Sequence, residues 1–325
     1  MARRVVVRRH GGPEVLEIES YEPPEPGPGE VRLRHTAIGL NFIDVYFRTG
    51  LYPPPQLPFT PGFEACGVVE AVGEGVDFLR PAQRVAYGTG PLGAYCDVRT
   101  MPAQYLVPIP DSIPDEVAAA MMLKGMTARY LLRRTYPVRP GDPILFHAAA
   151  GGVGLIACQW AKHLGATVIG TVGGPEKAEI ARAHGCDHPI DYTREDFVAR
   201  VDAITGGEKL PVVYDGVGRA TFLRSLDCLR PLGMMVSFGN ASGPVDPFDI
   251  GLLARKGALF LTRPTLFVYT RTRELLLEHA RDVIEVVAGG VVRVEIGQRF
   301  PLERVADAHR ALEGRRTVGA TVLLP

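Results

Sequence analysis

The sequence predicts an α/β protein with a β-rich first domain and a second domain built on a doubly wound parallel sheet. Three observations carry this prediction. The chain has 325 residues, 46% of them hydrophobic, which is enough for about two domains with cores of their own. Its first third reads as short strands separated by glycine and proline. From about residue 115, strand-sized apolar runs alternate with helix-length amphipathic segments, as in βαβ units.

The first domain is predicted from short apolar and β-branched runs bounded by turn-forming residues. The runs expected to form its strands are Arg3 to Arg9, Val31 to Ile38, Ala65 to Val72, Gln83 to Tyr87 and Tyr95 to Val98. Two proline-dense stretches, Pro23 to Pro28 and Pro53 to Pro61, are too short to link domains and are expected to fix the shape of loops.

The second domain is predicted from six strand-sized runs in one block, as in doubly wound nucleotide-binding sheets. They are Pro143 to His147, Thr167 to Val172, His188 to Ile190, Val212 to Tyr214, Met234 to Phe238 and Ala258 to Thr262. After them we expect a helix near Arg271 to Ala288, a strand near Val291 to Ile296, a helix near Leu302 to Leu312 and a final strand. This tail holds no further βαβ repeat, so it is expected to return to the first domain. The predicted domains are 1–120 and 121–262, followed by the tail 263–325.

Composition and charge argue against several classes of partner. Lys and Arg number 36, as do Asp and Glu, so no excess of one sign attracts the chain to nucleic acid or to an anionic membrane. No apolar run reaches the roughly 18 residues of a membrane helix, and the first residues do not resemble a signal peptide. The five cysteines are odd in number and widely spaced, which argues against a disulfide framework. We therefore expect a cytoplasmic protein.

A glycine-rich loop joins the first strand of the predicted parallel sheet to an amphipathic helix. The loop reads Ala148-Ala149-Ala150-Gly151-Gly152-Val153-Gly154. Gly151 and Gly152 let backbone N–H groups approach a pyrophosphate at the helix N-terminus, and Gly154 lets the helix pack closely on the sheet. Ala149 occupies the first glycine position of the G-x-G-x-x-G pattern. The order of strand, turn and helix therefore carries the prediction of a dinucleotide site.

The end of the second strand of this sheet favours NADPH over NADH. An NAD-specific site would have Asp or Glu there, about 20 residues after the loop, to bind the ribose 2′-hydroxyl. Here the segment reads Thr171-Val172-Gly173-Gly174-Pro175-Glu176-Lys177. Gly173 leaves room for a 2′-phosphate, and Lys177, in the first turn of the next helix, would neutralise it. An ordinary solvated lysine is the alternative interpretation of Lys177.

Two segments of the first domain resemble the zinc-dependent medium-chain alcohol dehydrogenases. Gly62-Phe63-Glu64-Ala65-Cys66-Gly67 is similar to their G-H-E signature, with Phe63 in place of the histidine ligand. Gly39-Leu40-Asn41-Phe42-Ile43-Asp44 is similar to the segment that carries a cysteine ligand, here Asn41. Phenylalanine and an amide cannot form the three-ligand site that catalytic zinc needs, so we expect no metal.

Three segments narrow the resemblance to zinc-free quinone oxidoreductases, the zeta-crystallin branch of the medium-chain dehydrogenase/reductase superfamily. They are Asn41 to Asp44, the glycine-rich loop with Leu155 to Ala161 after it, and Ser237-Phe238-Gly239-Asn240. The resemblance runs from end to end of the chain. It implies a GroES-like first domain completed by the tail, a Rossmann second domain, NADPH in the cleft between them, and a homodimer.

The resemblance also implies which residues contact the cofactor. Those expected near the nicotinamide are Asn41, Phe42, Thr127, Phe238, Gly239, Asn240, Pro264 and Leu266. Those expected on the phosphates are Gly152 and Val153 at the pyrophosphate, and Gly173, Lys177 and Tyr192 around the adenosine phosphate. Val217 is expected to cover the ribose or the adenine. Arg315 matches a tail arginine that reaches the cofactor, with Arg316 as the alternative.

Asn41 and Tyr52 are the candidate catalytic residues. The implied chemistry needs no metal, because NADPH delivers hydride directly to an electron-poor ring or double bond. Tyr52 follows Asn41 by eleven residues, a spacing that resembles that of the proposed proton donor in related enoyl-thioester reductases. Tyr46 is a second candidate donor, and closing the rim of a pocket is the alternative role for Tyr52. Asp44 is either a polar anchor or a loop cap.

Three functions remain open at this point. The leading hypothesis is NADPH-dependent reduction of soluble quinones by hydride or single-electron transfer. The second is reduction of α,β-unsaturated carbonyl compounds, because the chemistry at the acceptor carbon is similar and Tyr52 suits it too. The third is a cofactor-binding or RNA-binding protein without a catalytic role. The balanced charge and the lack of an RNA-reading motif argue against RNA.

Overall fold

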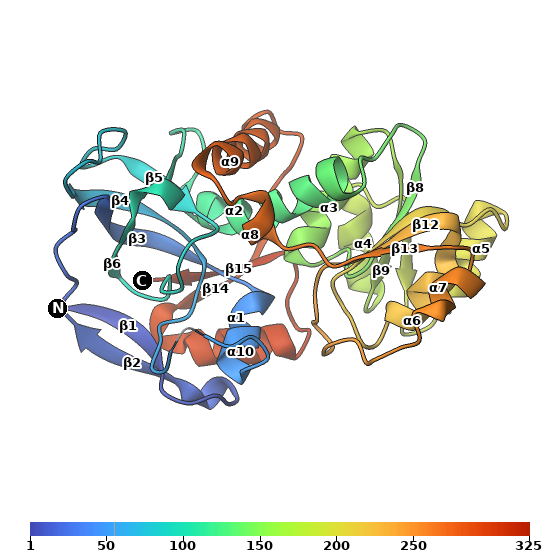
Figure 1. Cartoon of the computed structure of the whole chain (residues 1–325), viewed down its shortest axis with the longest axis horizontal. Helices are drawn as coiled ribbons and strands as arrows, with labels where there is room; N and C mark the ends of the chain where they lie inside the picture. The colour runs from blue at the N-terminus through green and yellow to red at the C-terminus, as the bar shows by residue number, and fades with distance from the viewer. Residues whose placement is uncertain (55) are drawn as a thin grey trace. The chain divides into compact units, whose positions relative to one another are not determined.

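The computed structural model describes residues 1–54 and 56–325, which form two compact units (Figure 1). Unit 1 contains Met1–Met126, Tyr269–Ala288 and Val294–Pro325, and unit 2 contains Thr127–Val268 and Gly289–Arg293. The domain limit expected between residues 120 and 121 falls inside helix α2 (Asp115–Tyr130). The limit expected between residues 262 and 263 falls at the end of strand β13 (Phe260–Thr262). No helix in the described ranges is long and apolar enough to cross a membrane.

Unit 1 is built on a seven-stranded sheet in the order β14-β15-β3-β4-β5-β7, with β6 paired to β3. Its strands are β3 (Glu30–Leu40), β4 (Glu64–Val72), β5 (Arg84–Tyr87), β6 (Val98–Pro102), β7 (Val107–Pro108), β14 (Ile296–Pro301) and β15 (Ala320–Leu324). A hairpin of β1 (Ala2–Val7) and β2 (Leu16–Tyr21) forms a sheet of its own. The last strand of the chain, β15, lies antiparallel to β3 and parallel to β14.

The helices of unit 1 are short apart from α9 and the part of α2 that belongs to it. They are η1 (Pro13–Val15), α1 (Phe42–Thr49), η2 (Ala103–Tyr105), α9 (Arg273–Ala288), η5 (Leu302–Arg304) and α10 (Val305–Glu313). Helix α1 begins after the extended Asn41 and ends at Gly50, whose φ of 80° suits a glycine C-cap. Figure 1 shows α1 and α10 side by side, and Arg48 of α1 pairs with Glu313 of α10.

Unit 2 is a six-stranded parallel sheet in the order β10-β9-β8-β11-β12-β13, the order of a Rossmann domain. The other strands are β8 (Pro143–Phe146), β9 (Thr167–Val172), β10 (His188–Asp191), β11 (Leu210–Asp215) and β12 (Leu229–Ser237). The helices are η3 (Leu131–Thr135), α3 (Gly152–His163), α4 (Pro175–Ala183), α5 (Phe197–Thr205), α6 (Phe222–Ser225), η4 (Leu226–Cys228), α7 (Gly251–Arg255) and α8 (Leu266–Tyr269), the last of which ends in unit 1. The predicted α/β class is confirmed.

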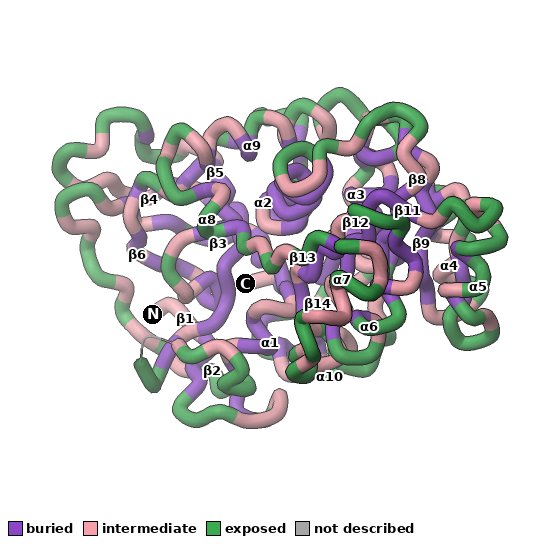
Figure 2. The backbone as a smooth tube through the Cα atoms, turned by 45° about the vertical axis from the view of Figure 1, so that its right-hand side comes forward, coloured by how far each residue is buried: buried purple, intermediate pink, exposed green. Residues whose placement is uncertain are grey.

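The two units have separate cores, which follow from the burial pattern of their strands (Figure 2). In β11 every residue is buried, as expected for a central parallel strand covered on both faces. In β3, Val31 and Leu33 are buried while Arg34 is exposed, which is the alternation of an antiparallel strand with one wet face. Each unit therefore has its own cluster of buried apolar side chains.

Two predicted strands are wrong in position, and two strands, β2 and the two-residue β7, were missed. Tyr95–Val98 was expected to be a strand, but Cys96 makes only an isolated bridge to Arg4, and β6 begins at Val98. The strand expected near Val291–Ile296 begins only at Ile296, because the Gln159 side chain binds the backbone N–H and C=O of Arg293 in place of a strand partner. Strand β2 was missed because Glu17, Glu19 and Ser20 leave no apolar run in it.

Candidate functional site

In unit 2, the loops that follow the parallel strands bring most of the predicted cofactor-binding residues to one edge of the sheet. All six strands are parallel, so their carboxyl ends meet at this edge, where nucleotides bind in open α/β sheets. The residues are Gly152 and Val153 after β8, Gly173 and Lys177 after β9, Tyr192 after β10, Val217 after β11, Phe238, Gly239 and Asn240 after β12, and Pro264 and Leu266 after β13. Thr127 comes from a different element, helix α2.

The glycine-rich loop makes a tight turn between β8 and α3. Ala148 has a φ of 55°, in the left-handed region that non-glycine residues adopt only when their surroundings hold them there. Gly151 is the extended N-cap of α3. A Cβ atom on Gly154 would lie 2.3 Å from the carbonyl oxygen of Ala148, so only glycine fits. The loop therefore holds the first-turn N–H groups of α3, which lack partners within the helix, at the edge of the sheet.

A glycine stands at the end of β9, where an NAD-specific site would have an acidic residue. A Cβ atom on Gly173 would lie 2.7 Å from the hydroxyl oxygen of Tyr192, so the glycine leaves this space to the tyrosine ring. Gly174 has a φ of 124°, and Pro175 begins helix α4. Lys177 lies in the first turn of that helix, where N–H groups point toward an anion. Gly173, Lys177 and Tyr192 thus form one corner of unit 2.

The loops after β11 and β12 are joined to each other. The N–H of Ser242 donates to the carbonyl of Val217 at 2.8 Å, and a Cβ atom on Gly239 would lie 2.4 Å from the carbonyl oxygen of Gly216. Arg263 donates to the carbonyls of Ser237 and Gly239 at 2.8 and 3.3 Å, which ties the end of β13 to the same loops. Sequence reasoning missed Arg263, because its partners are carbonyl groups that carry no sequence signal.

In unit 1, Asn41 belongs to a buried polar cluster. Its Nδ2 donates to Glu64 Oε2 at 2.9 Å. Glu64 is fully buried and also accepts from the Lys124 ammonium and from the N–H of Leu123, both at 2.8 Å. The carboxylate thus holds the Asn41 amide in one orientation. Lys124 was not predicted, although it is the one charge in the apolar stretch Ala118–Met126 and could have been found from that signal.

A second buried cluster joins α1 to α10. Asp44 Oδ2 accepts from the N–H of Asn41 at 2.9 Å and from the Tyr95 hydroxyl at 2.8 Å. Tyr95 also lies 3.2 Å from His309 Nε2, and Arg48 donates to His309 Nδ1 at 2.9 Å. Burial raises the pKa of Asp44 to about 7, with the hydrogen bonds from Tyr95 and Asn41 opposing it. Asp44 is therefore both a helix cap and a polar anchor.

Tyr52 packs on the aromatic face of α1. Its ring centroid lies 5.1 Å from that of Tyr46 and 5.9 Å from that of Phe47. The ring of Tyr46 lies 6.2 Å from that of Phe42, so the two candidate proton donors and Phe42 form one aromatic row. Arg315 is exposed just beyond Glu313, which pairs with Arg48 at the end of α1 opposite to Asn41. The structure thus brings Phe42, Tyr46 and Tyr52 together within unit 1.

Comparison with known proteins decides the family. A model described as "Zinc-binding dehydrogenase" matches residues 152–278, and one described as "Alcohol dehydrogenase GroES-like domain" matches residues 27–111. A quinone oxidoreductase of Pseudomonas aeruginosa is 55% identical over 325 residues, covering 100% of both chains. The chain belongs to the quinone oxidoreductase family. This confirms the resemblance read from the motifs.

Two further matches show which activities are named for proteins similar to this member of the quinone oxidoreductase family. The crystal structure of Escherichia coli quinone oxidoreductase complexed with NADPH matches with a TM-score of 0.98 at 49% identity, covering 99% of this chain and 100% of that chain. A 2-haloacrylate reductase of a Burkholderia species is 47% identical over 334 residues, covering 100% of this chain and 99% of that protein. The same scaffold therefore carries two named reductase activities.

The residues of this quinone oxidoreductase family member do not fit a zinc ion, although one matching model is described as zinc-binding. Phe63 is buried and packs on Phe47, with ring centroids 5.4 Å apart. The Asn41 amide donates to Glu64, whose charge is already balanced by Lys124. Within residues 1–54 and 56–325, no group of three or more His, Cys, Asp or Glu side chains could hold a metal ion.

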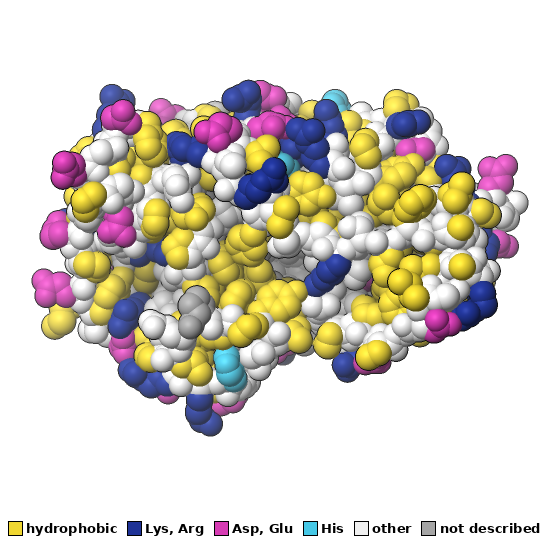
Figure 3. Space-filling model, in the orientation of Figure 1, with side chains coloured by type: hydrophobic (Ala, Val, Ile, Leu, Met, Phe, Trp, Pro, Cys, Tyr) yellow, Lys and Arg dark blue, Asp and Glu magenta, His cyan; other side chains and the backbone are white. Residues whose placement is uncertain are grey.

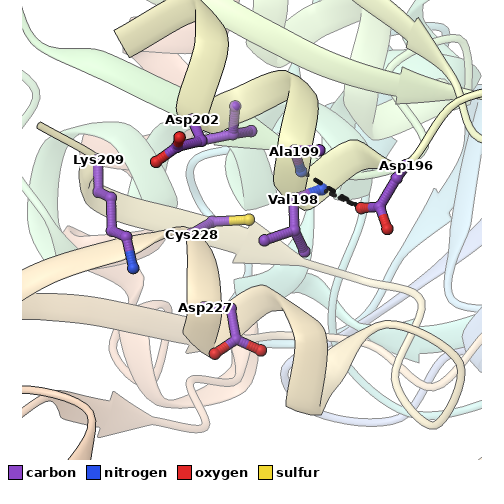
Figure 4. Close-up of a pocket in the computed structure, with 8 residues that line it drawn as sticks. Asp196, Val198, Ala199, Asp202, Lys209, Asp227 and Cys228 are labelled. Carbon is purple, nitrogen blue, oxygen red and sulfur yellow. Dashed lines mark hydrogen bonds between the residues drawn. The ribbon is translucent and has the colours of Figure 1, made fainter. Parts of the chain in front are cut away.

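A cavity of about 340 Å³ lies elsewhere in unit 2 (Figure 4). It is lined by Asp196, Val198, Ala199, Val201, Asp202, Lys209, Asp227 and Cys228. The Asp196 carboxylate accepts from the N–H groups of Val198 and Ala199, as an ordinary cap of α5 does. None of the predicted site residues lines this cavity, so it is separate from the edge of the sheet at which those residues gather.

Proposed function

We propose that this protein catalyses NADPH-dependent reduction of quinones without a metal ion. The observation that carries the proposal is the corner formed by Gly173, Lys177 and Tyr192. It has a glycine and a lysine where an NAD-specific site would have an acidic residue. Full-length identity of 55% to a quinone oxidoreductase supports the choice of acceptor.

We propose that the first turn of α3, at Gly152 and Val153, holds the pyrophosphate, and that Gly173, Lys177 and Tyr192 surround the 2′-phosphate. Val217 would cover the ribose or adenine. The residues proposed for the nicotinamide half are Asn41, Phe42, Thr127, Phe238, Gly239, Asn240, Pro264 and Leu266, with Arg315 reaching the cofactor from the tail. A quinone oxidoreductase of this family has been crystallised with NADPH, which supports the choice of cofactor.

Bound NADPH would supply a hydride to the quinone ring. Two residues are proposed as catalytic. Asn41, held by Glu64 and by the cap at Asp44, would align the nicotinamide, and Tyr52 would supply a proton to the quinone oxygen. The aromatic row from Phe42 to Tyr52 would keep water from the acceptor.

The test is to follow the loss of NADPH absorbance with a simple benzoquinone, and to repeat the assay with NADH and after treatment with a zinc chelator. We expect turnover with NADPH, a much lower kcat/KM with NADH, and no effect of the chelator. Tight NADPH binding without any turnover would overturn the proposal in favour of a binding protein.

Reduction of an activated carbon–carbon double bond is the second candidate function. The observation that favours it is the full-length match to a 2-haloacrylate reductase. The same assay with 2-chloroacrylate and with an alkenal distinguishes the two functions. A kcat/KM higher for these compounds than for benzoquinone would replace quinone reduction by this alternative.

The cofactor preference gives a sharp prediction at Gly173. An aspartate there brings a carboxylate to the proposed 2′-phosphate, and the repulsion lowers kcat/KM with NADPH by about a hundredfold. The same carboxylate accepts a hydrogen bond from a ribose 2′-hydroxyl, so kcat/KM with NADH rises. Gly173→Ala is the matched control, because it adds a Cβ atom near the Tyr192 hydroxyl without a charge. Equal losses in the two variants would contradict a phosphate at this corner.

We also propose that the protein is a homodimer that pairs through β13. This strand is the last in the sheet order, and its Phe260 and Leu261 are 56% and 38% exposed. Ile250 and Leu232 nearby are also exposed, and hydrophobic side chains lie on the surface over β12, β13 and α7 (Figure 3). An unpaired strand edge with exposed apolar side chains favours association with a second chain.

The dimer is tested by light scattering. We expect twice the chain mass of 35.2 kDa for the wild type and a monomer for the double variant Ile250→Glu/Phe260→Glu. Ile18→Glu is the control, since Ile18 is an exposed apolar residue of the β1–β2 hairpin in the other unit. A dimer that survives the double variant would contradict pairing through β13.

We propose the cytoplasm as the site of action. All five cysteines are free and buried, as is usual in a reducing compartment. Cell fractionation with an antibody against the chain tests this, and recovery outside the cytoplasmic fraction would contradict it.

A further inference from the structure

A chain of buried hydrogen bonds runs across three neighbouring strands beneath the glycine-rich loop. Its centre is His147, which follows β8 and is 1% exposed. The Nδ1 atom of His147 lies 2.9 Å from Thr171 Oγ1 on β9. The Nε2 atom lies 2.8 Å from Ser225 Oγ on α6. The histidine belongs to none of the segments proposed to contact NADPH, yet it is linked to two of them.

The partners of His147 determine which of its nitrogens carries the proton. Ser225 Oγ lies 2.9 Å from the carbonyl of Thr221 and 3.3 Å from Asp215 Oδ2, and it donates its one proton to these acceptors. It must therefore accept from His147 Nε2–H. Nδ1 is then the acceptor for the Thr171 hydroxyl. Burial lowers the pKa of His147, with the Asp215 carboxylate opposing it, which favours the neutral ring.

One end of the chain of hydrogen bonds is the glycine-rich loop. The N–H of Ala148 donates to Thr171 Oγ1 at 3.3 Å, and the N–H of Ala149 donates to the Thr171 carbonyl at 3.0 Å. Ala148 is the residue with the left-handed backbone. With its proton donated to His147 Nδ1, the Thr171 hydroxyl is held in one rotation, and a lone pair of its oxygen accepts from the N–H of Ala148. His147 thus fixes the group that holds the strained start of the loop.

The other end is the turn after β11. Asp215 Oδ1 accepts from the N–H groups of Val217 and Gly218 at 2.7 and 3.0 Å. Asp215 Oδ2 accepts from the Thr221 hydroxyl at 2.7 Å, beside Ser225. This turn contains Val217, which is proposed to cover the ribose or adenine. The neutral imidazole of His147 therefore connects the glycine-rich loop to the Asp215–Gly218 turn. That turn follows β11, which pairs with β8 on the side away from β9.

We propose that His147 is a positioning residue for NADPH: it holds Thr171 and Ser225 so that the Ala148–Gly154 loop and the Asp215–Gly218 turn are ordered before the cofactor binds. This inference rests on the proposed function, since it takes these two segments as part of the NADPH site. It assigns to His147 an effect on the binding of the cofactor and none on the transfer of hydride.

The test compares three substitutions at one site. His147→Leu removes both hydrogen bonds, and it is expected to raise the NADPH dissociation constant and KM by about tenfold, the effect of losing about one buried hydrogen bond. The kcat at saturating NADPH is expected to stay within about twofold of the wild type, because a pre-ordering role ends once the cofactor is bound. His147→Asn retains an acceptor near the Nδ1 position and is expected to recover most of the affinity. His147→Gln retains only a donor toward Ser225 and is expected to recover less.

The matched control is Asp187→Ala. Asp187 accepts from the N–H of Val168 at 2.9 Å, at the amino end of β9 and away from the loop. This variant is expected to lower the melting temperature of unit 2 and to leave the NADPH dissociation constant unchanged. Should His147→Leu fail to fold, Ser225→Ala is measured instead, with an expected rise in the dissociation constant of about threefold.

Two results separate the failure of this inference from the failure of the proposed function. Wild-type protein that does not bind NADPH by calorimetry would overturn the proposed function. Wild-type protein that binds NADPH, with His147→Leu lowering only the melting temperature as Asp187→Ala does, would overturn the positioning role of His147.

Discussion

Replacing Lys124 by methionine lowers the free energy of unfolding of unit 1 by about 3–5 kcal/mol, the usual cost of breaking a buried ion pair. The Lys124 ammonium lies 2.8 Å from Glu64, and the two side chains are 6% and 0% exposed. Methionine fills a similar volume but leaves the carboxylate charged in an apolar surrounding. Urea unfolding followed by circular dichroism measures the loss. The single tryptophan, Trp160, lies in unit 2, so its fluorescence follows that unit alone and should change little.

Two variants control this experiment. The double variant Lys124→Met/Glu64→Gln removes both charges and recovers most of the lost stability. Lys162→Met breaks the ion pair with Asp187, in which the lysine is 52% exposed, and it costs at most about 1 kcal/mol. A loss at Lys124 no larger than the loss at Lys162 would contradict a strong buried pair.

The contribution of Asp44 to the stability of unit 1 decreases as the pH rises from about 4 to about 7, while the buried His35 and His309, whose pKa values are lowered to about 3, contribute in the opposite direction. The pKa of Asp44 is about 7 in the folded chain, against 3.8 for an ordinary aspartate, because the side chain is fully buried. A raised folded-state pKa contributes stability that is complete below the unfolded pKa and is lost as the pH rises through the folded pKa. The slope is about 1.4 kcal/mol per pH unit within this window.

Asp44→Asn removes this slope, since an amide does not titrate. The amide oxygen still accepts from the N–H of Asn41 and from the Tyr95 hydroxyl, so the cap of α1 is kept. Urea unfolding of both proteins at pH 5, 6, 7 and 8 gives the difference between the two slopes. Parallel pH profiles for the wild type and the variant would show that Asp44 is already ionised at pH 5.

An element of the fold was predictable from the sequence where residues close together in the chain determine it. Strand β9 was predicted with the bounds Thr167 to Val172 that the structure has, because it is an apolar run between turn residues. Strand β2 carries glutamates on its exposed face, so no apolar run in the sequence predicts it. The start of β14 depends on a contact between Gln159 and Arg293, which are 134 residues apart. No local pattern contains such a contact.

In the candidate site, too, features with a local sequence signal were predictable and features that depend on distant residues were not. The tight turn at Ala148–Gly154 was predictable, because glycine marks places where a side chain would collide with its surroundings. The pair of Glu64 and Lys124 was not, because its members lie 60 residues apart on a strand and a helix. Both ring nitrogens of His147 lie within hydrogen-bond distance of hydroxyl groups. Its connection to two loops could not be predicted, because it runs through Thr171 and Ser225 to the residues that these two contact in turn.

The pairing of β15 with β3 has a consequence for the order in which a newly made chain folds. The ribosome releases Thr127–Val268 as one nearly complete nucleotide-binding unit, which can fold while later residues are still being added. Strand β3, made early, has its Ile38, Gly39 and Leu40 opposite Leu323, Val322 and Thr321 of the last strand. Its edge there stays open until β15 has been made, which happens after Thr127–Val268 has been made. The sheet of unit 1 is therefore begun before unit 2 and completed after it.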